Sequence, residues 1–273
     1  IFIDNYIPTP VSDCYGNENG QIFIEADGGT GAKRYSIYAG DTLTNGLFED
    51  LGGGEYTISI IDRNYCVIDT TVSLAQPSEI VFDDATIIPV TGCSDDTNGE
   101  ITVTVSGGTG TGSYDYAIDG GAYNGSNSFS GLAGGDHTIS VMDSNGCPKD
   151  TIINVPAPLP VSISNVTSTD VSCNGSNDGE IRITATGGNS AYTYTITPGG
   201  YSNNDGIFTG LAPDTFTVNV MDGNNCGNIN SLPVIISEPE AIIIDSVLTQ
   251  EILCSGDNNA EIHIYAQGGT MPY

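Results

Sequence analysis

Residues 93–108 read CSDDTNGEITVTVSGG, and the same phrase begins four times in the chain at a period of about 80 residues. Each copy opens on a cysteine, continues as an alternation of apolar and polar residues, and ends at a Gly-Gly pair. The opening cysteines are Cys14, Cys93, Cys173 and Cys254. A period of this length predicts a row of similar small domains, and a feature that recurs in every copy is better explained as scaffold than as a catalytic site.

The second half of the unit occurs three times. It holds a Phe-x-x-Leu step, an alternating run such as residues 137–141, an Asp-x-Asn-x-Cys motif and a closing proline. This pattern predicts repeat 1 at residues 1–77, repeat 2 at 78–158, repeat 3 at 159–239, and the N-terminal part of repeat 4 at 240–273. The fourth copy stops inside a repeated motif, so we expect the chain to be a fragment of a longer protein.

The alternation has a period of two, which is typical of half-buried strands. In repeat 2 it predicts six strands, at residues 80–88, 101–105, 114–118, 127–132, 138–142 and 151–155. No segment has a useful helical period. The sequence therefore predicts an all-β protein of tandem immunoglobulin-like antiparallel β-sandwich domains in a linear array.

The charge is strongly acidic, with 34 Asp and Glu against 5 Lys and Arg and a net charge of −29. Such a chain is unsuited to bind nucleic acid, because binding requires that Lys and Arg neutralise phosphates. No apolar run approaches 18 residues, so we expect no membrane insertion. The acidity favours either solubility and self-repulsion in an extended molecule or bound Ca²⁺.

The cysteines recur as pairs, with spacings of 52, 54 and 53 residues within the three full repeats. Pairing within repeats predicts Cys14–Cys66, Cys93–Cys147 and Cys173–Cys226. Pairing across repeats, beginning with Cys66–Cys93, fits the count equally well. Four expected strands separate the cysteines of one repeat, and an even number returns the chain to the end where it began. We therefore expect pairing within repeats, worth roughly 4 kcal/mol per disulfide in the chain-entropy model, and an oxidising location outside the cytoplasm.

Catalytic motifs are absent from the sequence. The two histidines, His137 and His263, occupy positions that other repeats fill with unrelated residues, and no nucleophile elbow, phosphate loop or zinc motif occurs. We expect a protein that is not an enzyme.

Calcium is the one cofactor that the sequence suggests. The Asp-x-Asn motifs resemble the opening of a Ca²⁺ loop, although the remainder of such a loop is missing, and an Asx-type turn explains the same residues. They are Asp62 and Asn64, Asp143 and Asn145, and Asp222 and Asn224. A second candidate is the acidic loop after each first cysteine, with Asp95, Asp96, Glu100, Asp178 and Glu180.

Several motifs of repeat 3 together resemble the SprB repeat of very large surface adhesins of Bacteroidota. They are residues 173–181 (CNGSNDGEI), the Gly-Gly pair, the Tyr-x-Tyr of Tyr192 and Tyr194, residues 208–211 (FTGL) and residues 222–226 (DGNNC). The resemblance implies type IX secretion, display on the cell surface, and adhesion or gliding. Exported proteins of that phylum are often O-glycosylated at Asp-Ser/Thr motifs, which implies acceptors at Thr42, Thr70, Thr151 and Ser246.

The leading hypothesis is a stalk that presents a distal tip. The expected partners are neighbouring repeats of the same chain and a polysaccharide or surface ligand bound outside this fragment. The first alternative is a self-associating extracellular filament or sheath, in which the chain binds itself in a fibre. The second is an array of carbohydrate-binding modules, against which the absence of Trp argues.

Overall fold

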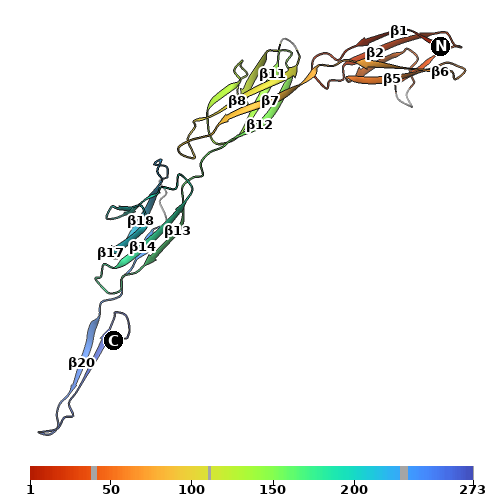
Figure 1. Cartoon of the computed structure of the whole chain (residues 1–273). Coiled ribbons are helices and arrows are strands. Elements are labelled where there is room, and N and C mark those ends of the chain that lie inside the picture. Colours follow the sequence, from red (N-terminus) through yellow and green to blue (C-terminus); the bar gives the residue numbers. More distant parts are fainter. Residues whose placement is uncertain (38–41, 110–111, 228–232, 273) are drawn as a thin grey trace. The chain divides into compact units, whose positions relative to one another are not determined.

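The computed structural model describes residues 1–37, 42–109, 112–227 and 233–272, and their regular structure is β-strand throughout (Figure 1). All strand pairs are antiparallel, which confirms the predicted all-β class. In these ranges there is no helix that could span a membrane. Two compact units are present, residues 1–89 with 98–155 and residues 90–97 with 156–273.

The first unit contains repeat 1 and all the strands of repeat 2, and each of these repeats is built of two three-stranded sheets. Residues 90–97 and 156–158 of repeat 2 belong to the second unit. In repeat 1 the sheets are β1 (Phe2–Thr9), β2 (Gly20–Asp27) and β4 (Leu47–Leu51), and β3 (Arg34–Ser36), β5 (Gly54–Ile61) and β6 (Val67–Leu74). In repeat 2 they are β7 (Ser78–Ile88), β8 (Gly99–Gly108) and β10 (Ser128–Leu132), and β9 (Tyr114–Ile118), β11 (Gly135–Asp143) and β12 (Pro148–Val155). All six strands predicted for repeat 2 are confirmed.

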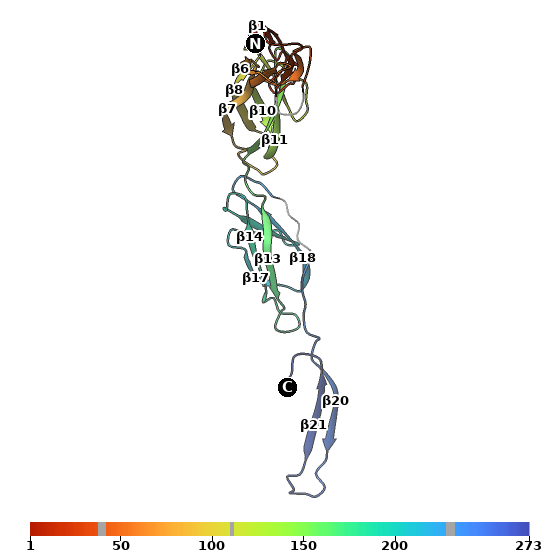
Figure 2. The same ribbon diagram turned by 90° about the vertical axis from the view of Figure 1, so that its right-hand side faces the viewer.

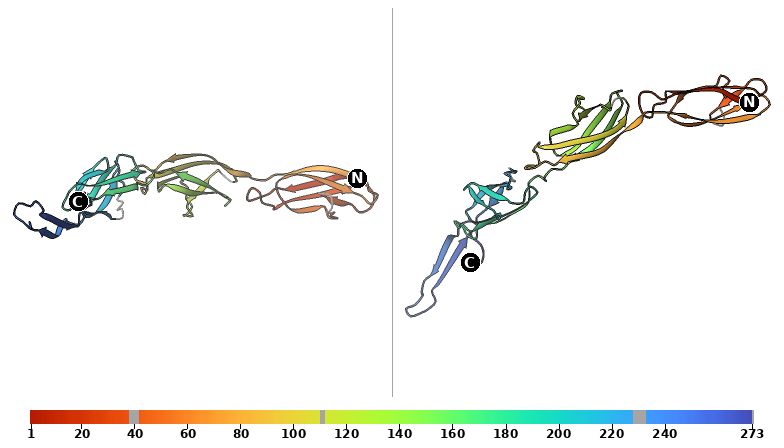
Figure 3. Two further views of the ribbon diagram at one scale, coloured as in Figure 1. Left: turned by 90° about the horizontal axis from the view of Figure 1, so that it is seen from below. Right: turned by 45° about the horizontal axis from the view of Figure 1, so that its top comes forward.

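The second unit contains repeat 3 and a hairpin from repeat 4. Strands β13 (Ser162–Thr169), β14 (Gly179–Thr186) and β17 (Ile207–Leu211) form one sheet of repeat 3, and lie side by side in Figures 1 and 2. Its other sheet contains β15 (Thr193–Thr197), β16 (Tyr201–Asn203), β18 (Asp214–Met221) and β19 (Val234–Ile236). Strands β20 (Ile243–Gln250) and β21 (Glu261–Gln267), blue in Figure 3, pair only with each other. No strand pairing among the described residues crosses the predicted repeat boundaries.

The core of each repeat lies between its sheets and follows the alternation of the sequence. In repeat 3, Ile181 and Ile183 on β14 face Val218 and Val220 on β18, and each is at most 3% exposed. Phe208 of the Phe-x-x-Leu step joins the same core. Burial of each such side chain contributes about 1.5–3 kcal/mol, so the core accounts for the regular recurrence of these positions.

The Gly-Gly pair bends the chain at the end of β14. Gly187 and Gly188 have φ values of 79° and 55°, in the left-handed region that favours glycine. A Cβ atom on Gly188 would clash with the carboxylate of Asp222, which follows β18. The pair therefore lets the end of β14 come close to the end of β18, where the second cysteine motif begins.

The course of the chain places the two cysteines of repeat 3 at opposite ends. Asn189, after β14, donates its backbone N–H to Asp222, after β18, so both strands end at the same place, here called the N-terminal pole. Strand β14 starts at the other end, the C-terminal pole, where the N–H of Val171 binds the carbonyl of Ser237 (3.2 Å). Cys173 precedes β14 and Cys226 follows β18, so the first lies at the C-terminal pole and the second at the N-terminal pole.

Candidate functional site

The disulfides join neighbouring repeats. Cys14 is bonded to Cys147 and Cys93 to Cys226, in both cases over 133 residues of sequence, with Cα atoms 5.5 and 5.3 Å apart. The predicted pairs Cys14–Cys66, Cys93–Cys147 and Cys173–Cys226 are wrong, and the alternative Cys66–Cys93 does not occur either. Each bond links the first cysteine of one repeat to the second cysteine of the next.

The prediction failed because one short strand was not foreseen. Strand β16 pairs antiparallel with β15, and isolated bridges mark the same pass in repeats 1 and 2 (Tyr35–Leu43 and Tyr116–Asn124). Five passes, not four, therefore separate the cysteines of one repeat. The eight residues of β14 span about 26 Å, whereas a disulfide requires Cα atoms within about 7 Å. Pairing inside a repeat is thus geometrically excluded.

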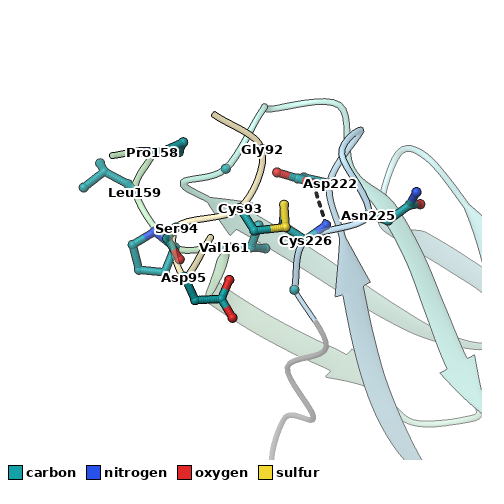
Figure 4. Close-up of a pocket in the computed structure, with 13 residues that line it drawn as sticks. Gly92, Cys93, Ser94, Asp95, Pro158, Leu159, Val161, Asp222, Asn225 and Cys226 are labelled. Atoms are coloured by element: carbon teal, nitrogen blue, oxygen red, sulfur yellow. Dashed lines mark hydrogen bonds between the residues drawn. A yellow bond between two sulfur atoms is a disulfide. The ribbon is translucent and has the colours of Figure 1, made fainter. Parts of the chain in front are cut away.

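Each disulfide is part of a larger arrangement, here called the clamp: the loop at a first cysteine, the disulfide, and the Asp-x-Asn-x-Cys turn of the next repeat. Figure 4 shows the clamp at Cys93–Cys226. Oδ1 of Asp222 accepts the backbone N–H groups of Asn224 and Cys226 (both 2.9 Å). The side-chain amide of Asn224 donates to the carbonyl of Gly92 beside the first cysteine (3.3 Å). The turn is therefore held both by its own repeat and by the loop to which it is bonded.

The clamp at Cys14–Cys147 is built in the same way. Oδ1 of Asp143 accepts the N–H groups of Asn145 (3.0 Å) and Cys147 (2.9 Å). Its Oδ2 accepts both the N–H and the hydroxyl of Thr109, at 2.7 and 2.8 Å. The same Thr109 hydroxyl lies 3.3 Å from the carbonyl oxygen of Asp13 in the first-cysteine loop. Four donors thus converge on one carboxylate that is only 4% exposed.

The electrostatics of the turn favour the charged carboxylate. Burial raises the pKa of Asp143 and of Asp222, but the surrounding N–H groups outweigh burial, so both pKa values fall below the ordinary value. In repeat 1 the hydrogen bond from the N–H of Thr30 is the largest influence, and the pKa of Asp62 is again lowered. The three buried aspartates are therefore anionic anchors of the turn at neutral pH.

One functional position was missed from the sequence. In repeats 1 to 3 the residue after the Gly-Gly pair donates its N–H to Oδ2 of the aspartate, as Thr30, Thr109 and Asn189. The signal for this contact was the constant recurrence of the Gly-Gly pair together with the Asp-x-Asn-x-Cys motif.

The remaining cysteines, Cys66, Cys173 and Cys254, are unpaired and exposed. The disulfides expected at Cys66 and Cys173 are thus wrong within this chain. Cys66 still has the complete turn around it, because Asp62 binds the N–H groups of Asn64 (2.8 Å) and Cys66 (2.9 Å). The first-cysteine loop is also preserved at Cys254, where the N–H of Asp257 binds the Cys254 carbonyl (3.2 Å).

The Asp-x-Asn residues form hydrogen-bonded turns. Because the oxygens of Asp62, Asp143 and Asp222 accept backbone N–H groups, a cation at these residues would have to displace several donors. The geometry therefore supports the Asx-turn interpretation over the calcium interpretation at these residues.

The acidic loop residues have separate partners. Asp96 accepts the N–H of Cys93 (2.7 Å), and Asp178 accepts the N–H of Ser172 (3.0 Å). Glu100 accepts the Ser128 hydroxyl (2.9 Å), and Glu180 forms an ion pair with Arg182. Asp95 and Asp96 lie close to the sulfur of Cys93, but that sulfur belongs to the disulfide. Calcium at this loop stays an untested alternative to solubility as the role of the acidic residues.

The predicted glycan acceptors differ in exposure. Thr42 and Ser246 are exposed, although Asp41 of the first motif lies outside the described residues. Thr70 and Thr151 are half-buried on β6 and β12, each an edge strand of its sheet. Glycosylation at these residues stays a prediction.

The histidines lie in different repeats, and each contacts a carboxylate. Nδ1 of His137 lies 2.7 Å from Asp119, and its Nε2 lies 3.0 Å from the Ala133 carbonyl. These contacts, the Asp119 hydrogen bond above all, raise the pKa of His137. His263 lies 3.1 Å from Glu261.

Comparison with known families matches two segments, residues 86–123 and 165–200, to the SprB repeat. The matched segments include the first cysteines Cys93 and Cys173 and the Gly-Gly pairs that follow them. They confirm the resemblance on which the sequence interpretation relied. No curated protein matches the chain.

Several solved structures of multidomain proteins are similar at low identity. Domains 3–5 of Drosophila OTK are 10% identical, with a TM-score of 0.25 over 84% of this chain and 99% of that one. Immunoglobulin domains 1–5 of Sidekick-1 are 8% identical, with a TM-score of 0.30 over 97% of this chain and 63% of that one. Domains 7, 8 and 9 of the S-layer protein SbsC are 10% identical, with a TM-score of 0.23 over 76% of this chain and 79% of that one.

Proposed function

We propose that the chain is a non-enzymatic stalk region of a large secreted cell-surface adhesin, which carries a distal tip for surface attachment or gliding. The observation that supports this proposal most is the clamp, because a disulfide between successive repeats connects domains instead of stapling each one. The SprB repeats and the disulfides support an extracellular location. In this proposal export follows the type IX route that the SprB resemblance implies.

The connectivity of the two clamps gives the chain two parallel covalent paths. A pulling force that reaches Cys14 can continue along residues 14–93 and cross the second disulfide. It can equally cross the first disulfide and continue along residues 147–226. Because both disulfides span 133 residues, the two paths contain the same number of residues. The loss of one disulfide therefore leaves the greatest length of the stalk unchanged.

Single-molecule pulling tests this proposal. The chain is stretched from its two ends, in a background in which Cys66, Cys173 and Cys254 are replaced by Ser to prevent exchange. We expect Cys147→Ser or Cys226→Ser alone to leave the fully extended length unchanged. The double variant should lengthen by the full 133-residue loop, or roughly 450 Å at 3.3–3.6 Å per residue.

Other outcomes separate the stalk from its alternatives. If each single substitution released its own segment, the parallel connection would be absent, and the mechanical argument for a stalk would fail. Ordered fibres of the purified chain in electron micrographs would favour the filament or sheath. Binding of the chain to a glycan array would favour a carbohydrate-binding function over a stalk whose ligand is bound elsewhere.

A further inference from the structure

The two clamp disulfides, Cys14–Cys147 and Cys93–Cys226, have different electrostatic surroundings. We propose that Sγ of Cys14 is the site at which small anionic thiols, such as glutathione, open the chain, whereas carboxylates beside Cys93 protect the second clamp. The proposal goes beyond the stalk function, and it concerns the chemistry of the two bonds, so its failure would leave the pulling experiment unaffected.

Burial determines which sulfur a thiolate reaches in either clamp. Cys147 and Cys226 are only 6% and 7% exposed, whereas Cys14 and Cys93 are half-buried. The rate of thiol–disulfide exchange depends on access to the attacked sulfur. We therefore expect attack on the first cysteine in both clamps, with the second cysteine as the leaving group.

A hollow at each clamp gives a small thiol access to the disulfide. The hollow at Cys14 has a volume of about 330 Å³, and the hollow at Cys93 has a volume of about 550 Å³. Space alone would therefore make the second clamp the easier target. The buried aspartates of the turns, Asp143 and Asp222, each line the hollow of their own clamp, so they do not distinguish the two.

Two carboxylates lie beside the sulfur of Cys93. An oxygen of Asp95, an oxygen of Asp96 and Sγ of Cys93 all lie within 4.8 Å of one another. Asp95 is exposed and lines the hollow (Figure 4), and Asp96 accepts the N–H of Cys93 (2.7 Å). A thiolate that attacks this sulfur must therefore come close to two negative charges.

At Cys14 the same two loop positions are uncharged. They are occupied by Gly16 and Asn17. Besides the buried aspartate, the charged side chains among the described residues that line this hollow are Glu79 and Lys149. They form an ion pair at 2.7 Å, so their charges cancel.

Two other carboxylates of the Cys14 loop have contacts elsewhere. Asp13 accepts the side-chain amide of Asn19 (3.0 Å). Glu18 lies near Gly52, with its Cγ 4.0 Å from the place that a Cβ atom on that glycine would take. Neither Asp13 nor Glu18 lines the hollow, so an incoming thiolate meets less negative charge there than at the second clamp.

For an anionic thiol, charge outweighs space. A carboxylate about 5 Å from the attacking thiolate slows the attack roughly fourfold at the dielectric constant of water, so a pair slows it by about tenfold. The hollow at Cys93 is less than twice as large as the hollow at Cys14, which changes access by a smaller factor. For a neutral thiol the bulk of the repulsion is absent, and the preference for the first clamp should disappear.

The reduction proceeds in two exchange steps. A glutathione thiolate attacks Sγ of Cys14, the bond to Cys147 breaks, and Cys147 leaves as a thiolate that takes a proton from buffer. A second glutathione thiolate attacks the glutathione sulfur of the mixed disulfide and releases the thiolate of Cys14, which is protonated in turn. One protein disulfide is reduced to two thiols, and two glutathione thiols are oxidised to one glutathione disulfide.

Reduction followed by alkylation tests the proposal. The chain, with Cys66, Cys173 and Cys254 replaced by Ser, is exposed to glutathione at low ionic strength, quenched with acid, alkylated and mapped by mass spectrometry. We expect both cysteines of the first clamp to be alkylated about tenfold faster than those of the second, with the glutathione adduct on Cys14. With the neutral thiol 2-mercaptoethanol, the first clamp should have no such advantage.

A variant without the two charges identifies the cause. Asp95→Asn with Asp96→Asn should speed the opening of the second clamp by glutathione about tenfold and leave its opening by 2-mercaptoethanol unchanged. A loosened loop would instead accelerate both thiols alike. The matched control, Asp84→Asn with Asp115→Asn, removes two exposed charges from β7 and β9 and should leave the opening of the second clamp unchanged.

Three results would overturn the proposal. The first is a second clamp that opens as fast as the first clamp, or faster, with glutathione. The second is the same preference for the first clamp with 2-mercaptoethanol, since access and not charge would then decide. The third is a variant at Asp95 and Asp96 that leaves the glutathione rate unchanged or accelerates both thiols alike.

Discussion

Replacing Cys93 separates the observed disulfide pattern from the one that the sequence suggested. Cys93 and Cys173 are both first cysteines with the same local loop, but only Cys93 is bonded to Cys226 of repeat 3. Cys93→Ser should therefore destabilise repeat 3. The matched control, Cys173→Ser, removes an exposed unpaired thiol and should change its stability by less than about 0.5 kcal/mol.

The size of the effect follows from the loop that the bond closes. The N–H of Val90 holds the carbonyl of Pro156 at 2.8 Å, so the start of the linker to repeat 3 is fixed near the loop that carries Cys93. When repeat 3 unfolds while repeat 2 stays folded, the disulfide closes a loop of about 70 residues, from Pro156 to Cys226. The chain-entropy model gives about 4 kcal/mol for such a loop, which corresponds to roughly 15–30 °C in the melting temperature of a domain of this size.

Hydrogen exchange measured by mass spectrometry resolves this loss repeat by repeat. Amides of β14 and β18 should exchange about a thousandfold faster in Cys93→Ser, the equivalent of 4 kcal/mol. Amides of β2 and β5 in repeat 1 serve as the internal reference and should not change. The reasoning is refuted if Cys173→Ser accelerates exchange in repeat 3 while Cys93→Ser does not, because that result requires Cys173–Cys226.

Three further predictions concern the turns, the His137–Asp119 ion pair and calcium. Asp143→Asn leaves one carboxamide oxygen for four donors, so it should lower the free energy of unfolding by about 3–5 kcal/mol, as measured by urea unfolding. The exposed control Asp115→Asn should change it by almost nothing. Equal losses in the two variants would contradict the anchoring role of Asp143. The raised pKa of His137 and the lowered pKa of Asp119 stabilise repeat 2 most between about pH 4 and 6.5, and this contribution should fall as pH rises through the folded pKa of His137. His137→Phe should abolish that decline, as measured by urea midpoints from pH 5 to 9. Millimolar Ca²⁺ in place of chelator should leave the melting temperature unchanged, whereas a rise of many degrees would show that the acidic loops hold the ion.

The strands were predictable because local chemistry determines them. Alternation of β-branched and polar residues, as in residues 101–105, became β8 with Ile101 and Val103 fully buried. The buried aspartates were partly predictable, since the Asx turn was one of two interpretations of Asp-x-Asn. Their N–H partners after the Gly-Gly pair were not, because that contact joins residues more than 30 positions apart and depends on how two sheets pack.

The disulfide pattern could not be predicted, because it depends on whether the number of strands between the two cysteines of a repeat is odd or even. Strand β16 has three residues, Tyr201–Asn203, and the matching pass in repeats 1 and 2 is a single bridge. Such a pass is too short to show an alternating pattern. A count of strands is nevertheless sensitive to it, because one additional pass moves the second cysteine from one pole of the sandwich to the other.

The same parity explains why the disulfide links successive repeats. The described residues of repeat 3 form seven strands, β13 to β19, and an odd number brings the chain in at one pole and out at the other, as a tandem array requires. The first cysteine follows the first strand and so lies at the C-terminal pole; the second follows the sixth and lies at the N-terminal pole. Two cysteines placed in this way cannot meet inside one repeat, but each lies where the chain passes to a neighbouring repeat. A fold that carries the chain from pole to pole therefore makes these cysteines available to the junctions, which is where the proposed stalk would need a covalent bond under tension.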